Sequence, residues 1–397
     1  MLKKYRVISL FSGAGGMDLG FLKHNFEIVW ANDFFPEAVE SYRKNIGDHI
    51  VYGDITKIDC SDMPDDIDVV IGGFPCQGFS IANKGRHEKD ERNFLYREML
   101  RVIKNKKPKI FVAENVKGIL SLAKGKVIKM IENDFKKLGY KVDIKLLNAA
   151  EYGVPQQRER VIIIGNKLKK ENKFPEKTHS LTAERGYKKS ITVKESIEFL
   201  SSIELSELPI EIDDKVIYNH IASINVADKF WGRKYKVNQA EICDYLKEYR
   251  NKSGLSTKKI DEIFGYKHTA GHWFRKDNKS GSIPNPSDWR KLKKILEFDN
   301  KYDKVVTTFI EKEIKFEQSL RITNWDRPSD TITATSPEIH VNKMRRLSVR
   351  ECAIIQTFPL EYEFVGNLSH MYTQIGNAVP VLLASKIAKN IELMLKD

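Results

Sequence analysis

The chain has 397 residues, of which 41% are hydrophobic, and this is ordinary for a globular protein with a sizeable core. No run approaches the roughly 18 apolar residues that a membrane-spanning helix needs, and the first residues do not resemble a secretion signal. These features exclude an integral membrane protein of the helical type, and we expect a cytoplasmic protein.

The net charge limits the classes of ligand that the protein can be expected to bind, and the cysteines limit the kinds of structural site that it can contain. A net charge of +13 favours polyanions, although RNA, an anionic membrane or simple solubility would give the same balance as DNA. The four cysteines form no C-x-x-C pair. The pattern therefore predicts neither a disulfide framework nor a structural zinc site.

Between residue 5 and about residue 166, strand-like apolar runs alternate with amphipathic helical patterns. This alternation predicts an α/β fold with a doubly wound, mostly parallel sheet, in which ligands bind beyond the carboxyl ends of the strands. We predict strands at residues 7–10, 27–30, 69–71, 110–113, 142–147 and 161–165, and helices at 18–24, 36–45, 93–106 and 127–138.

A glycine-rich turn at residues 11–16 follows the first predicted strand, and its glycines let a ligand approach the main chain. A dinucleotide fingerprint requires a third glycine where this chain has Asp18, which disfavours a pyrophosphate ligand. Asp33 follows the second strand and can accept both hydroxyls of a ribose, and Asp54 follows the third and can accept from an adenine amino group. Together these features indicate S-adenosylmethionine, although each alone also fits ordinary loop glycines or an N-cap aspartate.

Three further groups of polar residues follow or precede strands. Cys76 stands between Pro75 and Gln77 at the end of a strand, before a polar loop, which is typical of an exposed nucleophile. Glu114 ends another strand, and a carboxylate that caps the following helix is the alternative interpretation. Arg158 and Arg160 precede a strand and, two residues apart, share a face. Taken alone, they also fit an ordinary basic strand edge.

Six motifs follow one another along the chain. They are Ser9-Leu10-Phe11-Ser12-Gly13-Ala14-Gly15-Gly16, Pro75-Cys76-Gln77, Glu114-Asn115-Val116, residues 156–160, residues 345–352 and Gln374-Ile375-Gly376-Asn377-Ala378-Val379-Pro380. In this order they resemble the motifs of the C5-cytosine DNA methyltransferases of bacterial restriction-modification systems. The resemblance implies a Rossmann-like S-adenosylmethionine-dependent enzyme that methylates duplex DNA, and a functional pairing with a restriction endonuclease. We expect a monomer. The chain departs from the family pattern at Ser9, Ser12, Asn93-Phe94 and Thr357.

The chemistry of this family explains the polar groups. The cytosine ring is electron-poor, so C5 is a weak nucleophile; a thiolate from Cys76 would add to C6 and turn C5 into a nucleophilic enamine carbon. Glu114 would donate to N3, and of Arg158 and Arg160 one would hold the base and the other would support Glu114. The duplex hides C5 and C6, so the base must leave the duplex to reach Cys76.

The resemblance also implies the binding residues. We expect Gln77, Ser80, Lys84 and Arg86 to contact DNA, with residues 81–92 forming a mobile lid, although a solvated surface loop is the alternative. The donor pocket is expected to comprise Phe11, Ser12, Gly13, Ala14, Gly15, Gly16, Asp33, Phe34, Asp54, Ile55, Pro75, Leu95, Asn377, Ala378 and Val379.

The alternation of strand-like runs with helical patterns stops near residue 167, which indicates an insertion into the doubly wound domain. We predict a catalytic domain at 1–189, a smaller target-recognition domain at 190–364, and a return to the catalytic domain at 365–397 that ends in a helix at 381–395. Residues 255–275 have the outline of a helix-turn-helix, and a helical hairpin packed around Trp273 and Trp289 fits equally well. His268 and His272 lack further ligands, so we expect no metal.

Two other functions fit parts of the sequence. An RNA methyltransferase of the same fold would also use a cysteine, but the long basic insertion favours duplex DNA. A non-enzymatic DNA-binding regulator would use the helix-turn-helix outline, and the intact catalytic set argues against it. The target sequence is not readable from the insertion.

Overall fold

The computed structural model divides by its contacts into two compact units, Met1–Ile224 with Glu317–Asp397, and Asn225–Phe316. None of the helices within the described residues is long and apolar enough to cross a bilayer. The described residues are 3–75, 95–182, 184–224, 226–233, 237–264, 273–274, 283–311, 320–335 and 337–396.

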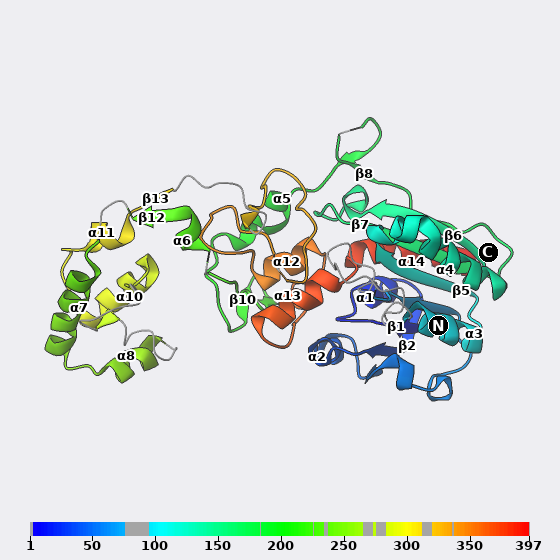
Figure 1. Ribbon diagram of the computed structural model, residues 1–397, viewed down its shortest axis with the longest axis horizontal. Coiled ribbons are helices and arrows are strands. Elements are labelled where there is room, and N and C mark those ends of the chain that lie inside the picture. The colour runs from blue at the N-terminus through cyan, green and yellow to red at the C-terminus, as the bar shows by residue number, and fades with distance from the viewer. Residues whose placement is uncertain are drawn as a thin grey trace. The chain divides into compact units, whose positions relative to one another are not determined.

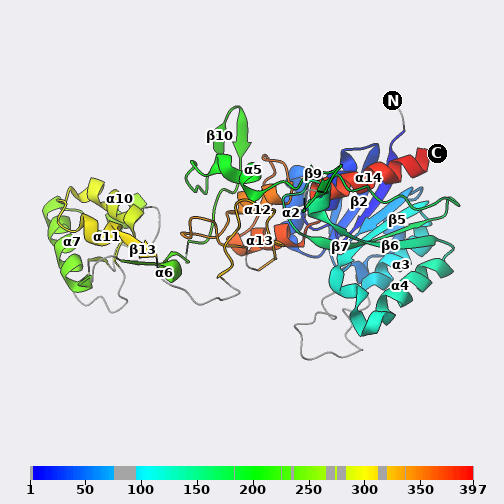
Figure 2. The same cartoon turned by 90° about the horizontal axis from the view of Figure 1, so that it is seen from above.

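The larger unit is built on a seven-stranded sheet with the order β3-β2-β1-β4-β5-β7-β6. Figures 1 and 2 show this sheet with helices packed against it. Neighbouring strands are parallel except for β7, which runs antiparallel to both β5 and β6. The predicted doubly wound, mostly parallel α/β fold is confirmed. The strands are β1 (Tyr5–Leu10), β2 (Phe26–Asp33), β3 (Ile50–Tyr52), β4 (Val69–Gly72), β5 (Ile110–Val116), β6 (Lys141–Asn148) and β7 (Glu159–Asn166).

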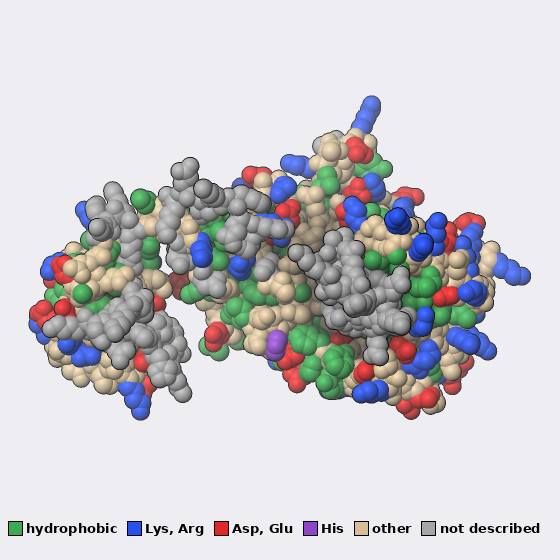
Figure 3. All heavy atoms as spheres, viewed as in Figure 1, with side chains coloured by type: hydrophobic (Ala, Val, Ile, Leu, Met, Phe, Trp, Pro, Cys, Tyr) green, Lys and Arg blue, Asp and Glu red, His purple; other side chains and the backbone are tan. Residues whose placement is uncertain are grey.

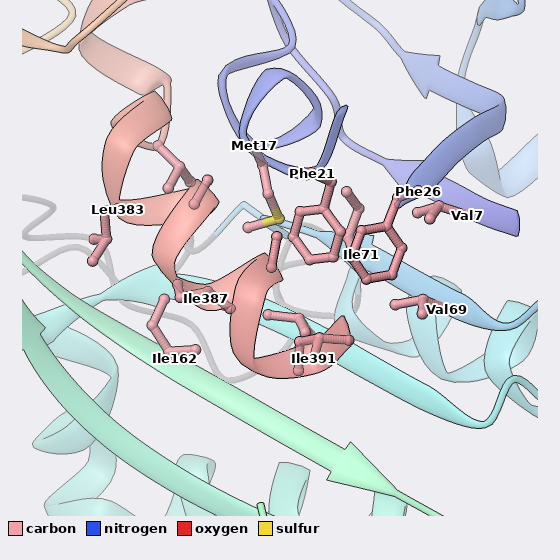
Figure 4. Packing of buried hydrophobic residues seen from close by; sticks show 14 of the residues in the cluster. Val7, Met17, Phe21, Phe26, Val69, Ile71, Ile162, Leu383, Ile387 and Ile391 are labelled. Atoms are coloured by element: carbon pink, nitrogen blue, oxygen red, sulfur yellow. The ribbon is translucent and has the colours of Figure 1, made fainter. Parts of the chain in front are cut away.

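Hydrophobic cores cover both faces of this sheet because successive strand side chains point to opposite sides. On one face, Val7 and Ile71 pack with helices α1 and α14 (Figure 4). On the other, Ile8 and Val70 pack with α3 and α4. The C-terminal helix is confirmed as α14. The helices of this unit are α1 (Gly16–Leu22), α2 (Pro36–Asn45), α3 (Leu95–Lys106), α4 (Lys126–Lys137), α5 (Val193–Ile197), α12 (Val349–Ile355), α13 (Leu368–Asn377) and α14 (Val381–Lys396).

The larger unit also contains segments that we predicted for the smaller domain. Residues 190–224 and 317–364 lie in it because a further hydrophobic core joins Val193 and Leu347 to Ala14 of the glycine-rich turn. The compact smaller unit is therefore narrower than the predicted range 190–364. Two short strand pairs complete the larger unit, β8 (His179–Ser180) with β9 (Lys188–Lys189), and β10 (Ile210–Ile212) with β11 (Lys215–Ile217).

The smaller unit is mainly helical and has its own aromatic core. Trp273 and Trp289 are both buried there, as the helical-hairpin interpretation predicts. Residues 265–272, with His268 and His272, lie outside the described residues, so the helix-turn-helix stays a prediction. The elements are α6 (Ala227–Phe230), β12 (Trp231–Arg233), α7 (Gln239–Ser253), α8 (Thr257–Phe264), α10 (Pro286–Leu296), α11 (Asp303–Thr307) and β13 (Phe309–Glu311), which pairs with β12.

Thr357 stands where the family pattern favours glycine, and its backbone has a left-handed φ of 62°. Its hydroxyl accepts a hydrogen bond of 2.9 Å from the Leu382 amide in the first turn of α14. We expect Thr357→Ala to lower the free energy of unfolding by about 1 kcal/mol, because this bond is lost while the strain remains. Thr357→Gly should be nearly neutral, because it loses the same bond but relieves about 1 kcal/mol of strain. Urea unfolding of both variants tests this; equal losses would contradict it.

Candidate active site

The carboxyl ends of β1, β2 and β3 meet at one edge of the sheet. The Gly53 amide donates to the Asp33 carbonyl at 3.0 Å, and the Asn32 side-chain amide donates to the carbonyls of Val51 and Gly53, each at 2.9 Å. These bonds tie the end of β2 to the segment that leads to Asp54. Asp33 and Asp54 therefore follow adjacent strands at the same edge, as the sequence predicts.

The glycine-rich turn is fixed against Asp33. The Gly13 amide donates to Asp33 Oδ2 at 2.7 Å, and the Phe35 amide donates to Oδ1 at 2.8 Å. Burial raises the pKa of Asp33. Gly13 has a φ of 54°, and a Cβ placed on it would have no atom within 4 Å. The turn is thus backed by protein and open above Gly13, which leaves room for a ligand against the main chain.

The C-terminal motif packs against the same turn. A Cβ on Gly16 would lie 2.5 Å from the Val379 carbonyl oxygen and 3.1 Å from the Ala378 Cβ, so only glycine permits this approach. Asn377, the last residue of α13, is exposed. Segments more than 350 residues apart in the chain therefore meet at the expected donor pocket.

The remaining residues expected in the donor pocket differ in their exposure to solvent and in their hydrogen bonds. Asp54 caps the 3-10 helix Ile55–Lys57, and its Oδ1 accepts from the Thr56 hydroxyl at 2.8 Å and the Thr56 amide at 3.0 Å. These two bonds lower the pKa of Asp54. The N-cap interpretation is therefore correct for this residue, and a contact with adenine stays a prediction. Phe34 is exposed, Ile55 is buried, and Phe11, Ser12, Pro75 and Leu95 are half-buried.

Glu114 and Arg160 form a buried ion pair, with Arg160 Nε 2.8 Å from Glu114 Oε1 and both side chains 11% exposed. Burial lowers the pKa of Arg160, and the charge of Glu114 opposes that effect. Glu114 lies inside β5, and Val116, the N-cap of the following 3-10 helix, makes no side-chain cap. The helix-cap interpretation of Glu114 is therefore wrong. A Cβ on Gly73 would lie 2.9 Å from Glu114 Oε2, so glycine makes room for this carboxylate.

Asn115 positions the segment that leads to the expected nucleophile. Its side-chain amide donates to the Phe74 carbonyl at 3.0 Å in a buried bond. Sequence reasoning gave Asn115 no role, although it belongs to the motif that contains Glu114. Cys76, Gln77, Ser80, Lys84 and Arg86 lie outside the described residues, so their contacts stay predictions.

We predicted that of Arg158 and Arg160 one would hold the base and the other would support Glu114, but the hydrogen bonds of Arg158 are made to main-chain carbonyls. Arg158 is buried, and its guanidinium donates to the carbonyls of Ile332 at 3.0 Å, Gly376 at 2.8 Å and Ala378 at 3.0 Å. Burial lowers its pKa well below the usual value. These donors are directed at main-chain carbonyls, so Arg158 holds the C-terminal motif in place, while Arg160 supports Glu114.

A pocket of about 650 Å³ has Arg160 in its wall. Part of the wall comes from a distant segment: the Thr331 hydroxyl donates to the Gln157 carbonyl at 2.8 Å, and the Ile332 amide donates to Gln156 Oε1 at 3.1 Å. Sequence reasoning missed this segment because it assigned residues 190–364 to the smaller domain. The pocket is lined by Val116, Lys117, Gly118, Asn148, Gln157, Glu159, Arg160, Arg321, Asp330 and Thr331.

A buried polar network underlies α12. Arg345 donates to both carboxylate oxygens of Glu351 at 2.6 and 2.8 Å, while Ser348 and Glu351 form a capping box at the start of the helix. Burial alone would raise the pKa of Glu351, but the bonds and charge of Arg345, together with His340 and the Ser348 amide, lower it below the usual value. No group of three or more metal-ligating side chains occurs among the residues that the structure describes.

Two buried histidines beside this network make stability depend on pH. Burial lowers the pKa of His340 and of His220 below the ordinary 6.5. Below about pH 6.5 the unfolded chain binds protons that the folded histidines do not, so stability is lost as the pH falls. We expect His340→Gln to reduce this loss by up to about 1.4 kcal/mol per pH unit, measured by urea unfolding between pH 7 and pH 5. An unchanged pH dependence would contradict this assignment.

Comparison with known proteins agrees with this geometry. The chain is 34% identical over 402 residues to the type II methyltransferase M.NgoFVII of Neisseria gonorrhoeae, covering 99% of this chain and 88% of that protein. It is also 34% identical to M.BspRI of Lysinibacillus sphaericus, covering 99% and 83%. A solved prophage DNA modification methyltransferase from E. coli shares the fold, with a TM-score of 0.60, 22% identity and coverage of 99% of this chain and 100% of that one.

A family model for C-5 cytosine-specific DNA methylase matches residues 5–393, nearly the whole chain. The match includes both the edge of the sheet that carries the glycine-rich turn and the Glu114–Arg160 pair. The chain therefore belongs to the C-5 cytosine-specific DNA methylase family, as its motifs predict, and is a DNA cytosine-5 methyltransferase.

Proposed function

We propose that this enzyme transfers a methyl group from S-adenosylmethionine to C5 of a cytosine that is flipped out of a specific duplex DNA site, and that it protects host DNA from a paired restriction endonuclease. The observation that carries the proposal is the Glu114–Arg160 ion pair of 2.8 Å, because Arg160 also forms part of the wall of the 650 Å³ pocket. A buried, charge-supported carboxylate beside a pocket suits the recognition of one extruded base.

The residues at the edge of the sheet fit the methyl donor. Both oxygens of Asp33 are fixed by main-chain amides, and their remaining lone pairs can accept two ribose hydroxyls. The open space above Gly13 allows a ligand to lie on the turn. The glycine-rich turn, Asp33 and residues 377–379 would hold the donor, which supplies an electrophilic methyl group when bound.

The other steps belong to the residues of the chain. The Cys76 thiolate adds to C6 of cytosine, and the electron pair moves to make C5 nucleophilic. Glu114 holds a proton or hydrogen bond at N3, and Arg160 keeps the Glu114 carboxyl in place. After methyl transfer, loss of the C5 proton and departure of the Cys76 sulfur restore the aromatic ring.

We propose that the unit Asn225–Phe316 reads the DNA target. In this segment Lys and Arg outnumber Asp and Glu, and contacts to phosphates need such a surplus. On the face shown in Figure 3, basic and acidic side chains are interspersed over the described surface. Base contacts from particular side chains, rather than one uniform basic patch, would therefore have to supply specificity. We propose that the enzyme acts as a monomer.

Methyl transfer to defined nucleic acids tests this function. Purified enzyme with tritiated S-adenosylmethionine should label duplex DNA and leave tRNA unlabelled, and bisulfite sequencing of a plasmid from expressing cells should show one short methylated sequence. Preferential labelling of tRNA would favour the RNA methyltransferase alternative. Salt-sensitive DNA binding without any labelling or donor binding would favour the regulator.

A further inference from the structure

Asp18 is a fully buried carboxylate that the reaction does not use. It lies in the first turn of α1, and it accepts two short hydrogen bonds, from the Ser9 hydroxyl to Oδ1 and from the Tyr42 hydroxyl to Oδ2, both at 2.7 Å. Ser9 belongs to β1 and Tyr42 to α2. One carboxylate therefore joins three elements directly beneath the glycine-rich turn.

The hydrogen bonds around Asp18 extend beyond Ser9 to Ser12 and beyond Tyr42 to His49. The Ser12 hydroxyl donates to Ser9 Oγ at 3.0 Å, and Ser9 in turn donates to Asp18. On the other side, His49 Nε2 lies 3.0 Å from the Tyr42 hydroxyl oxygen. Because Tyr42 uses its only proton toward Asp18, its oxygen is left to accept from His49. The Ser9 and Tyr42 hydroxyls both donate to Asp18, which suits an ionised carboxylate that only accepts.

Both branches reach the glycine-rich turn. Ser12 is part of the turn, and its amide also donates to the Asn32 carbonyl at 3.0 Å. The Tyr42 ring supports Gly15, since a Cβ there would lie 3.0 Å from ring atom Cδ2. A change at Asp18 would therefore disturb the turn at two points.

We propose that ionised Asp18 is a positioning residue that holds residues 11–16 in the shape that binds the methyl donor, so that protonation of Asp18 weakens donor binding. This rests on the proposed donor site. A protonated carboxyl gains an O–H donor on one oxygen, so the hydroxyl that faces this oxygen, of Ser9 or of Tyr42, must turn or move to make room for the new proton. Burial raises the pKa of Asp18 to about 6, so this change falls within an accessible pH range.

Other titratable groups surround Asp18. Asp33 faces it from the end of β2, and burial raises its pKa. Tyr42 from α2 and Tyr362, which donates to the Ala14 carbonyl at 2.6 Å, are buried with pKa values raised well above the ordinary value. His49 lies behind Tyr42, and burial lowers its pKa. Asp33 and His49 are therefore the groups whose titration must be separated from that of Asp18.

The test is calorimetric measurement of the dissociation constant for S-adenosylmethionine between pH 8 and pH 5. For the wild-type enzyme we expect the Kd to rise about tenfold as the pH falls, the equivalent of one lost hydrogen bond. Asp18→Asn carries an amide that mimics the protonated acid. Its Kd at pH 8 should therefore already be about tenfold higher than that of the wild-type enzyme, and the change of Kd with pH around pH 6 should be absent.

Two further variants identify the group that titrates. The exchange Ser9→Asp with Asp18→Ser restores a hydroxyl–carboxylate pair and should recover most of the affinity at pH 8, which a merely damaged fold would not. His49→Gln keeps a donor toward Tyr42 and should retain the wild-type pH profile. If Asp18→Asn also keeps that profile, Asp33 or His49 carries it and the inference is overturned. If the wild-type enzyme binds no S-adenosylmethionine at any pH, the proposed donor site fails instead.

Discussion

Glu114→Gln is expected to lower kcat for methyl transfer by about 10²- to 10⁴-fold, the usual contribution of a group that handles a proton. Glutamine keeps the size of the side chain, but it cannot give or take the proton at N3 as a carboxyl can. It also removes the charge that pairs with Arg160 at 2.8 Å. The measurement is methyl transfer at saturating DNA and donor, so that kcat is separated from binding.

Glu159→Gln is the matched control for this prediction. Glu159 lines the same pocket and pairs with Lys117 at 2.8 Å, but its side chain is 42% exposed and contributes to an ordinary surface ion pair. Its replacement should change kcat by less than about threefold, as expected for a loss within about 0.6 kcal/mol. Similar losses in both variants, or full activity with Glu114→Gln, would show that Glu114 has no special role.

Arg158→Met is expected to lower the free energy of unfolding by about 3–5 kcal/mol, in the range for breaking a buried polar network. The substitution removes three bonds to the carbonyls of Ile332, Gly376 and Ala378. The carbonyls of Ile332 and Gly376 lose the Arg158 donors, and the Ala378 carbonyl keeps only a bond of 3.4 Å from the Gln356 side-chain amide. Each buried group left unsatisfied costs about 1–3 kcal/mol. The change in the urea midpoint, with the slope held equal, measures this loss.

The control here is Arg327→Met. Arg327 Nη2 lies 3.5 Å from Asp330 Oδ1, and the Arg327 side chain is 51% exposed. We therefore expect this substitution to lower the free energy of unfolding by less than about 1 kcal/mol. If Arg158→Met is as stable as this control but inactive, Arg158 acts on the base after all. The positioning role given to it here would then be wrong.

The sequence predicts the features that depend on local patterns and on the topology of parallel strands. Near-continuous apolar runs in β1, β4 and β5 predict strands buried on both faces, and the structure has them. Because carboxyl ends of parallel strands share an edge, Asp33 and the glycine-rich turn could be expected to meet, and the Gly13–Asp33 bond of 2.7 Å joins them.

Features set by distant tertiary contacts were not predictable in the same way. Arg158 and Arg160 have the same side chain and stand two residues apart, so the sequence does not distinguish their roles. They have different partners only because the carbonyls of the C-terminal motif lie beside Arg158. Thr331 joins the pocket wall through a bond to Gln157, far away in the chain. No local pattern encodes either contact.

Mass spectrometry of the enzyme with a duplex that carries 5-fluorocytosine at the mapped target, in the presence of S-adenosylmethionine, tests the covalent mechanism most directly. Fluorine at C5 cannot leave as a proton does, so the bond between the thiol and C6 should persist. The account predicts a protein–DNA adduct that maps to Cys76 and is absent from Cys76→Ala. A folded, DNA-binding enzyme that forms no adduct, or forms one at another residue, would contradict it.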